Sequence, residues 1–183
     1  MSRIRAIEQH YTKNWGSDCE ECPFTKGPIH ELPVGFKVLA FPPHAERPMW
    51  SYATCGMSSV EDLNKMELHL FSPKKSDTLV ELLYAIAHFH HTGSPCRVGD
   101  TVNFGRPWLE SSLCSHGLIS LPYLDGPNLE NFNDENGTIK FYWLIPITTA
   151  ELELKKSTGI NALESKFDSS NFDYCNPSRP SVT

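Results

Sequence analysis

The sequence predicts a single α+β domain in which helices pack on a mixed, mostly antiparallel β-sheet. A chain of 183 residues most simply forms one domain, which buries about 70% of its unfolded surface. Segments with strand-like alternation occupy the middle of the chain, and segments with helical spacing lie around and between them. Strands covered on a face by helices are typical of the α+β class. We expect the domain to span residues 1–167, followed by a disordered tail at 168–183.

The first expected element is a short amphipathic helix over residues 2–14. Apolar and aromatic side chains recur there at helical spacing, at Ile4, Ile7, Tyr11 and Trp15. The segment 16–33 is rich in glycine, proline and acidic residues, which predicts an irregular surface connection. The core of the domain therefore extends over about 34–167.

Three strands are expected next, at 34–41, 50–55 and 66–70. In the third strand, apolar residues alternate with Glu67 and His69. Alternation of this kind indicates one buried face and one face in water, so we expect a half-solvated strand.

A central amphipathic helix follows, marked by Leu79, Leu82, Leu83 and Ile86. Thr78 and Glu81 have the spacing of a capping box at its start. Gly93 is placed to end the helix in the left-handed conformation.

The second half of the chain predicts strands at 101–104, 118–122 and 138–145. The dipeptide Asn136-Gly137 is a strong hairpin-turn signal directly before the last of them. A second capping box, Thr148 with Glu151, begins another helix. A final short helix is expected after Gly159, and the Ser, Asn and Pro content of 168–183 predicts disorder.

Composition argues against several classes of function. The formal net charge of −6 disfavours nucleic acid and anionic membranes, because both need a basic surface. No apolar run approaches the about 20 residues of a membrane span, and the N-terminus does not resemble a secretory signal. We therefore expect a cytoplasmic protein whose six cysteines stay reduced.

The cysteines and histidines do not complete a metal or catalytic motif in the sequence. Cys19 and Cys22 could hold half of a zinc site, but no second Cys-x-x-Cys pair completes it. His88, His90 and His91 fit the negative end of a helix better than a metal centre. We expect no metal, no cofactor and no catalytic residue.

Cysteine–histidine nucleophilic catalysis would be possible if Cys55 or Cys114 lay beside His69 or His116. Neither cysteine stands in a nucleophile motif. An enzyme that depends on a metal or a thiol therefore remains the alternative.

An ordered series of motifs closely resembles the suppressor-of-fused (SUFU) domain family. The series consists of "PMWSYATCGMS", "MELHLFSP", "LVELLYAIAHF", "VGDTV" and "LIPITTAELELKKSTGINALESKF", and the resemblance runs from about Val38 to Phe167. It implies a protein-binding domain without catalytic activity.

The resemblance also implies where a partner binds. In the family, the acid of the Gly-Asp motif lies at a groove for a partner peptide, and an aromatic residue late in the preceding helix assists. These positions are Asp100 and Phe89 here. A peptide that adds as a strand gains main-chain hydrogen bonds. Independently, Trp108 follows Arg106 by two residues in a Gly-Arg-Pro-Trp loop, and an exposed Trp beside Arg is typical of interface anchors.

Stand-alone domains of this family look bacterial, whereas eukaryotic members add a second domain that completes the peptide clamp. The resemblance therefore favours an immunity protein that neutralises a toxin by direct binding, and an acidic surface would steer a basic toxin toward it. A self-associating scaffold that pairs edge strands is a further alternative, and the oligomeric state stays open.

Overall fold

The computed structural model describes residues 2–183 and contains one eight-stranded sheet. Its strand order is β1-β2-β3-β4-β8-β6-β5, and β7 pairs with the first part of β8. Only the β4–β8 pairing is parallel among the described strands. The strands are β1 (Glu20–Cys22), β2 (Lys37–Phe41), β3 (Trp50–Cys55), β4 (Met66–Ser72), β5 (Thr101–Asn103), β6 (Cys114–Ser120), β7 (Asn131–Asp134) and β8 (Gly137–Thr148). The predicted α+β domain with a mixed, mostly antiparallel sheet is confirmed.

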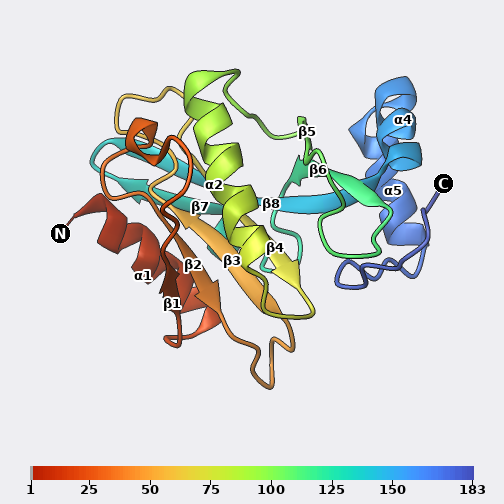
Figure 1. Cartoon of the computed structure of the whole chain (residues 1–183), viewed down its shortest axis with the longest axis horizontal. Coiled ribbons are helices and arrows are strands. Elements are labelled where there is room, and N and C mark those ends of the chain that lie inside the picture. The colour runs from red at the N-terminus through yellow and green to blue at the C-terminus, as the bar shows by residue number, and fades with distance from the viewer. Residues whose placement is uncertain (1) are drawn as a thin grey trace.

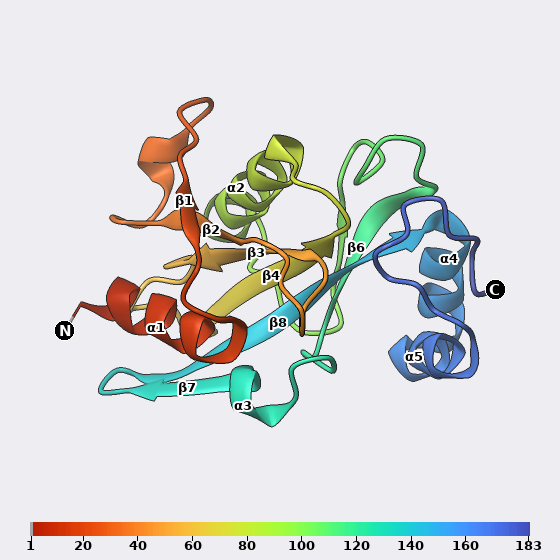
Figure 2. The same ribbon diagram turned by 90° about the horizontal axis from the view of Figure 1, so that it is seen from below.

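Helices cover both faces of the sheet (Figures 1 and 2). They are α1 (Arg3–Trp15), the 3₁₀ turn η1 (Ile29–Glu31), α2 (Asp77–Thr92), α3 (Pro127–Glu130), α4 (Thr149–Thr158) and α5 (Ile160–Ser169). One apolar core lies between the sheet and α2, and a second lies on the other face, under α1, α4 and α5. No helix within residues 2–183 has the length and apolar character needed to cross a membrane.

Strand β4 corrects the expectation of a half-solvated strand. All seven of its residues are buried, and Glu67 and His69 are 0% exposed. Because helices cover both faces of the sheet, the side that carries the polar residues faces the second core and not water. The apolar residues that alternate with Glu67 and His69 therefore face the first core, and these two polar residues face the second core, so the alternation did not indicate a solvent-exposed side.

The starts and ends of the helices match the capping predictions only in part. Thr148 and Glu151 form the predicted capping box at α4. Helix α2 instead begins after Ser76, and Glu81 makes no capping contact. Gly93 ends α2 with φ −109°, outside the left-handed region, so that prediction was wrong.

The last residues depart from the predicted disorder. Residues 170–183 contain no helix or strand, yet they pack on the second core. Arg179 is 4% exposed and binds the buried carboxylate of Glu151 at 2.6 Å. Phe172 stacks on Phe167 of α5, with ring centroids 4.1 Å apart. A buried ion pair and an aromatic stack hold this segment in place despite its polar composition.

Candidate protein-binding surface

The outer face of α2 is flanked by two features on which a partner could dock. The segment of residues 22–36 lies along one side of the helix, and the edge strand β5 lies beyond its other side (Figure 1). Helix α2 buries its apolar stripe in the first core but leaves Phe89 48% exposed. An exposed aromatic ring on a helix between two accessible elements is a suitable contact for a protein.

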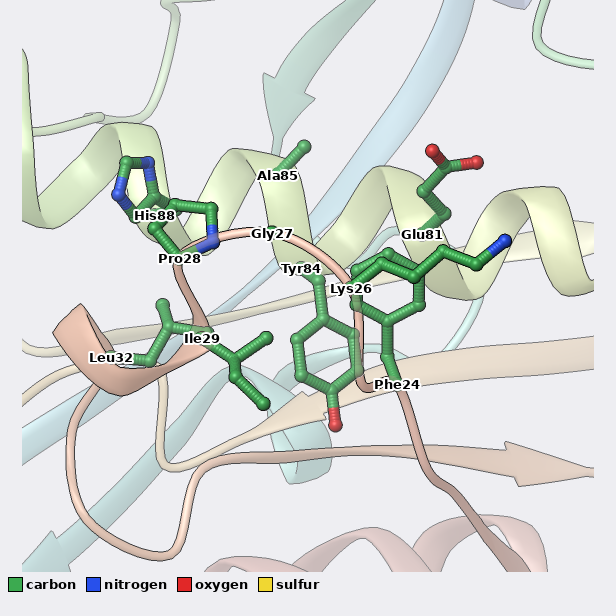
Figure 3. A pocket seen from close by; sticks show the side chains of 10 residues that line it. All are labelled: Phe24, Lys26, Gly27, Pro28, Ile29, Leu32, Glu81, Tyr84, Ala85 and His88. Atoms are coloured by element: carbon green, nitrogen blue, oxygen red, sulfur yellow. The ribbon is translucent and has the colours of Figure 1, made fainter.

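A hollow of about 280 Å³ separates α2 from the segment that carries η1 (Figure 3). Its walls are mainly apolar, formed by Phe24, Pro28, Ile29, Leu32, Tyr84 and Ala85. Glu81 and Lys26 lie at one end and His88 at the other, where its Nε2 lies 2.7 Å from Glu31 Oε2. This volume is just below the range of small-molecule pockets, so the hollow suits an apolar side chain of a partner better than a substrate.

Strand β5 is an edge of the sheet: no further strand pairs with it in the part of the chain that the structure describes. Ile119 N–H donates to Asp100 O at 2.9 Å, and Phe104 N–H donates to Ser115 O at 2.9 Å. In an antiparallel pair, alternate residues bond to the neighbouring strand. Because Asp100 and Phe104 bond to the β6 side, the main-chain groups of Thr101 and Asn103 point to the open edge.

Three of the four residues predicted as binding residues border this surface. Phe89 lies on α2, and Asp100 is exposed directly before β5. The Asp100 carboxylate accepts a hydrogen bond from Arg97 N–H at 2.8 Å, so it also shapes the turn. Arg106 follows β5 and binds Glu81 of α2 at 2.8 Å. This exposed ion pair links the loop after β5 to the helix.

Trp108 does not fit the expectation of an exposed anchor. It is 3% exposed, lies in the first core and donates its indole N–H to Ser112 Oγ at 2.8 Å. The chain folds back after Arg106, and Trp108 N–H bonds to Cys114 O at 2.9 Å. The large apolar ring is therefore turned inward, and only Arg106 of this pair can reach a partner.

The hollow was not predicted from the sequence. Its residues belong partly to the segment interpreted as an irregular connection, 16–33, and partly to α2. Pro28 and the apolar pair Ile29 and Leu32 were the only available hint, since apolar residues in a polar loop often pack on a neighbouring element.

The cysteines and histidines do not form a poised catalytic set. Burial raises the pKa of both Cys55 and Cys114, which favours the neutral thiol over the nucleophilic thiolate. Burial lowers the pKa of His69 to about 3, so its ring is neutral, and its 3.9 Å approach to Asp125 is not an ion pair. The described residues contain no group of three or more His, Cys, Asp or Glu side chains arranged to hold a metal ion.

His88, His90 and His91 at the end of α2 contact three different partners. His88 binds the Glu31 carboxylate, and His90 Nδ1 accepts a hydrogen bond from Cys96 N–H at 3.0 Å. His91 Nε2 bonds to the Met57 carbonyl. These contacts tie the helix end to the neighbouring loops, which is a structural role.

Comparison with known proteins identifies the family. Residues 33–180 match the family model of Suppressor of fused protein (SUFU). A crystal structure described as a SUFU homolog from Neisseria gonorrhoeae FA 1090 is 33% identical, with a TM-score of 0.86 over 99% of this chain and 97% of that chain. No sequence among the curated proteins matches.

Two further structures share the fold at lower identity. The Sufu–Fu complex matches at 17% identity and a TM-score of 0.72, over 98% of this chain and 92% of that chain. Drosophila Suppressor of Fused matches at 16% identity and a TM-score of 0.64, over 98% of this chain but 50% of that chain. Together with the family model and the Neisseria structure, the arrangement of sheet and helices establishes that the chain belongs to the suppressor-of-fused (SUFU) family.

Proposed function

We propose that this domain is a non-enzymatic protein-binding module and that it takes an extended segment of its partner as an added strand on β5. The observation that carries the proposal is the open edge of the sheet, where the main-chain groups of Thr101 and Asn103 have no neighbouring strand within residues 2–183. A strand added there would lie close to the Asp100 carboxylate, which can accept hydrogen bonds from a polar side chain.

The neighbouring features supply the other parts of a protein interface. Phe89 offers an exposed aromatic ring, and the hollow beside α2 can receive an apolar side chain. A structure of a SUFU protein in a complex, the Sufu–Fu complex, supports protein binding as the common role. The raised pKa values of the buried thiols argue against thiol catalysis.

In its most concrete form, the proposal is that the domain is a cytoplasmic immunity protein that neutralises a bacterial toxin. Its 33% identity to a bacterial homolog supports a bacterial setting for this role. The net charge of −6 would accelerate association with a basic toxin and suppress binding to acidic proteins.

The test combines capture of a partner with one backbone substitution. Thr101→Pro removes the outward N–H and leaves the ladder bonds of Asp100 and Phe104 to β6 in place. We expect this variant to lose the protein that the wild-type domain retains from lysate of the source cell, whereas Thr101→Ser, which keeps the N–H, retains it. If the partner is a toxin, co-expression of the wild type, but not of Thr101→Pro, restores growth.

Undiminished binding by a folded Thr101→Pro variant would rule out strand addition at β5. Light scattering over a dilution series tests the self-associating alternative, because pairing between copies must weaken as the protein is diluted.

A further inference from the structure

Residues 23–36 leave the sheet after β1 and return to it at β2, and we call this segment the flap. Its two ends lie together, because Cys22 pairs with Val38 where the two strands meet. A compact surface loop with adjoining ends is an Ω-loop, a class that is frequently functional. The flap lies beside α2 (Figure 1), and its chain crosses that helix at Gly27 (Figure 3).

The flap is weakly anchored to the rest of the chain. None of its residues is buried. Its main-chain hydrogen bonds are local: Ile29 N–H donates to Gly27 O and Glu31 N–H donates to Pro28 O, at 3.0 Å each. Within residues 2–183, no main-chain hydrogen bond joins the flap to α2. A segment with little burial and only local hydrogen bonds belongs to the least stable part of a fold.

Two side-chain contacts hold the flap on α2. The first is aromatic, since the rings of Phe24 and Phe36 pack on Tyr84 with centroids 5.1 and 5.0 Å away. The second is polar and joins Glu31 Oε2 to His88 Nε2 at 2.7 Å, and we call it the latch. The latch side chains of His88 and Glu31 are 29% and 45% exposed. Exposed polar pairs of this kind contribute little to stability, so the latch can break at low cost.

The flap also has room and hinges to move. The hollow of about 280 Å³ separates it from α2, and a further hollow of about 290 Å³ lies among Ile29, Val34 and Phe36. Empty space forfeits dispersion contacts, so the closed position is only weakly favoured. Gly27 and Gly35 lie on either side of η1 with φ values of +75° and +84°. Small loop residues at such positions are common hinges.

We propose that the flap is a lid that opens away from α2 by breaking the latch, and that the open state admits the partner's apolar side chain to the hollow. The inference rests on the proposed protein-binding function. The closed lid packs Phe24 and Phe36 on Tyr84 and leaves that residue 8% exposed. The open lid would offer these three rings in addition to the exposed ring of Phe89 on the same helix. Aromatic residues are enriched in protein interfaces.

The motion is measured in the free protein, so this part of the test needs no partner. Methyl relaxation-dispersion NMR on the full chain reports exchange on the microsecond-to-millisecond time scale of lids. We expect exchange at the methyl groups of Ile29 and Leu32 in the flap. The methyl groups of Leu83 and Ile86, which α2 buries in the first core, should show none.

Variants of the latch test its role. Glu31→Ala and His88→Ala should each raise the open population about twofold to fivefold, the range for an exposed polar contact. The double variant should raise it no further than either single variant, because both substitutions remove the same contact. The matched control is Glu135→Ala in the β7–β8 turn, which removes an exposed carboxylate outside the flap and should change nothing.

Capture of the partner tests the role of the open state. Apparent affinity rises in proportion to the population of the binding-competent state. Glu31→Ala should therefore tighten capture about twofold to fivefold, measured over a dilution series of the lysate. Ala85→Leu instead fills the hollow from α2, and it should weaken capture at least about threefold.

Exchange that is absent from the flap, shared equally by Leu83 and Ile86, or unchanged in both latch variants would overturn the lid. Undiminished capture by Ala85→Leu would overturn the role of the hollow. These outcomes are separate from strand addition. If Thr101→Pro keeps capture while Glu31→Ala tightens it, strand addition is wrong and the lid stands. If Thr101→Pro abolishes capture and the flap shows no exchange, the lid is wrong and strand addition stands.

Discussion

At the scale of single residues, Glu67 shows how a carboxylate can lie in the interior of this sheet. It accepts hydrogen bonds from Thr54 Oγ1 at 2.7 Å and from the N–H groups of Gly56 and Met57 at 3.0 Å each. These contacts fix the turn after β3. His69, two residues further along β4, has no hydrogen-bond partner for either ring nitrogen among the described residues. Burial raises the pKa of Glu67 and lowers the pKa of His69, so their contributions to stability change with pH in opposite directions.

The first prediction concerns Glu67→Gln. Burial raises the pKa of Glu67 from 4.5 to about 7, although its hydrogen bonds lower it. Between these pH values the folded protein binds more protons than the unfolded chain, so this residue makes stability fall as the pH rises. Relative to wild type, Glu67→Gln should therefore gain about 3 kcal/mol in the free energy of unfolding between pH 4.5 and pH 7, measured by urea titration.

His69→Phe should show the opposite trend, since its ring contacts are aromatic and no hydrogen bond is lost. Burial lowers the pKa of His69 from 6.5 to about 3, so the unfolded chain binds more protons over that interval. The wild type loses stability as the pH falls from 6.5 to 3, and the variant avoids this loss of about 5 kcal/mol. If the free energy of unfolding of either variant changed with pH in parallel with that of the wild type, the shifted pKa of the replaced residue would be contradicted.

At the scale of elements, α1 docks on the turn that Glu67 shapes. Gly56 has φ +87°, and a Cβ atom added there would collide with Ile4 in the first turn of α1. Cys55 directly precedes Gly56, and its Sγ atom lies 3.3 Å from the carbonyl oxygen of Ile4. The N-terminal helix is thus attached to the end of β3 by the Ile4 side chain packed on Gly56 and by the Cys55 contact, as well as by the burial of Ile7, Tyr11 and Trp15.

A methyl group at this position should loosen α1. Gly56→Ala combines a left-handed backbone with displacement of Ile4, and we expect a loss of about 2–4 kcal/mol in stability and faster hydrogen exchange of the α1 amides. Gly137→Ala is the matched control, because its φ is +116° and nothing lies within 4 Å of the added methyl group. That variant should lose only the strain energy. Unchanged exchange in α1 of Gly56→Ala would refute the docking role.

The accuracy of the sequence predictions varied between elements for identifiable reasons. The predicted strand at 50–55 matches β3, because aromatic and β-branched residues there end at a glycine turn. The start of α2 was misplaced, since Ser76 and Thr78 are both good N-cap residues and only the fold decides between them. The burial of Glu67 could not be predicted, because alternation does not reveal whether a second layer of helices covers the other face.

The sequence indicated single residues of the candidate site but not the shape of the surface on which they lie. Asp100 and Phe89 were indicated by the family resemblance, and both lie at the accessible surface. Trp108 was misjudged because local sequence does not say that the chain folds back and buries the ring. The hollow beside α2 joins segments distant in sequence, which no local pattern encodes.

At the scale of the whole molecule, the C-terminal segment closes the second core. The Arg179 guanidinium binds both oxygens of Glu151, at 2.6 and 2.7 Å, and the Pro146 carbonyl at 2.9 Å. Burial alone would raise the pKa of Glu151, but the hydrogen bonds from Arg179 and Thr148 lower it overall. The same carboxylate caps α4, so the tail, the helix start and the end of β8 form one connected unit.

This connection predicts a large effect from a residue near the end of the chain. Arg179→Met leaves the buried Glu151 carboxylate without its cation, which should cost about 3–5 kcal/mol at neutral pH. The double variant Glu151→Gln/Arg179→Met removes the stranded charge and keeps an acceptor for the α4 cap, so it should lose clearly less than Arg179→Met alone. Without the guanidinium, burial raises the pKa of Glu151, and acidification should restore part of the lost stability by protonating it. Urea titrations at two pH values measure all three effects. A disordered tail would give no change in any of these measurements. If Arg179→Met were as stable as the wild type, the contact with Glu151 would be contradicted and the predicted disorder of residues 168–183 would be supported.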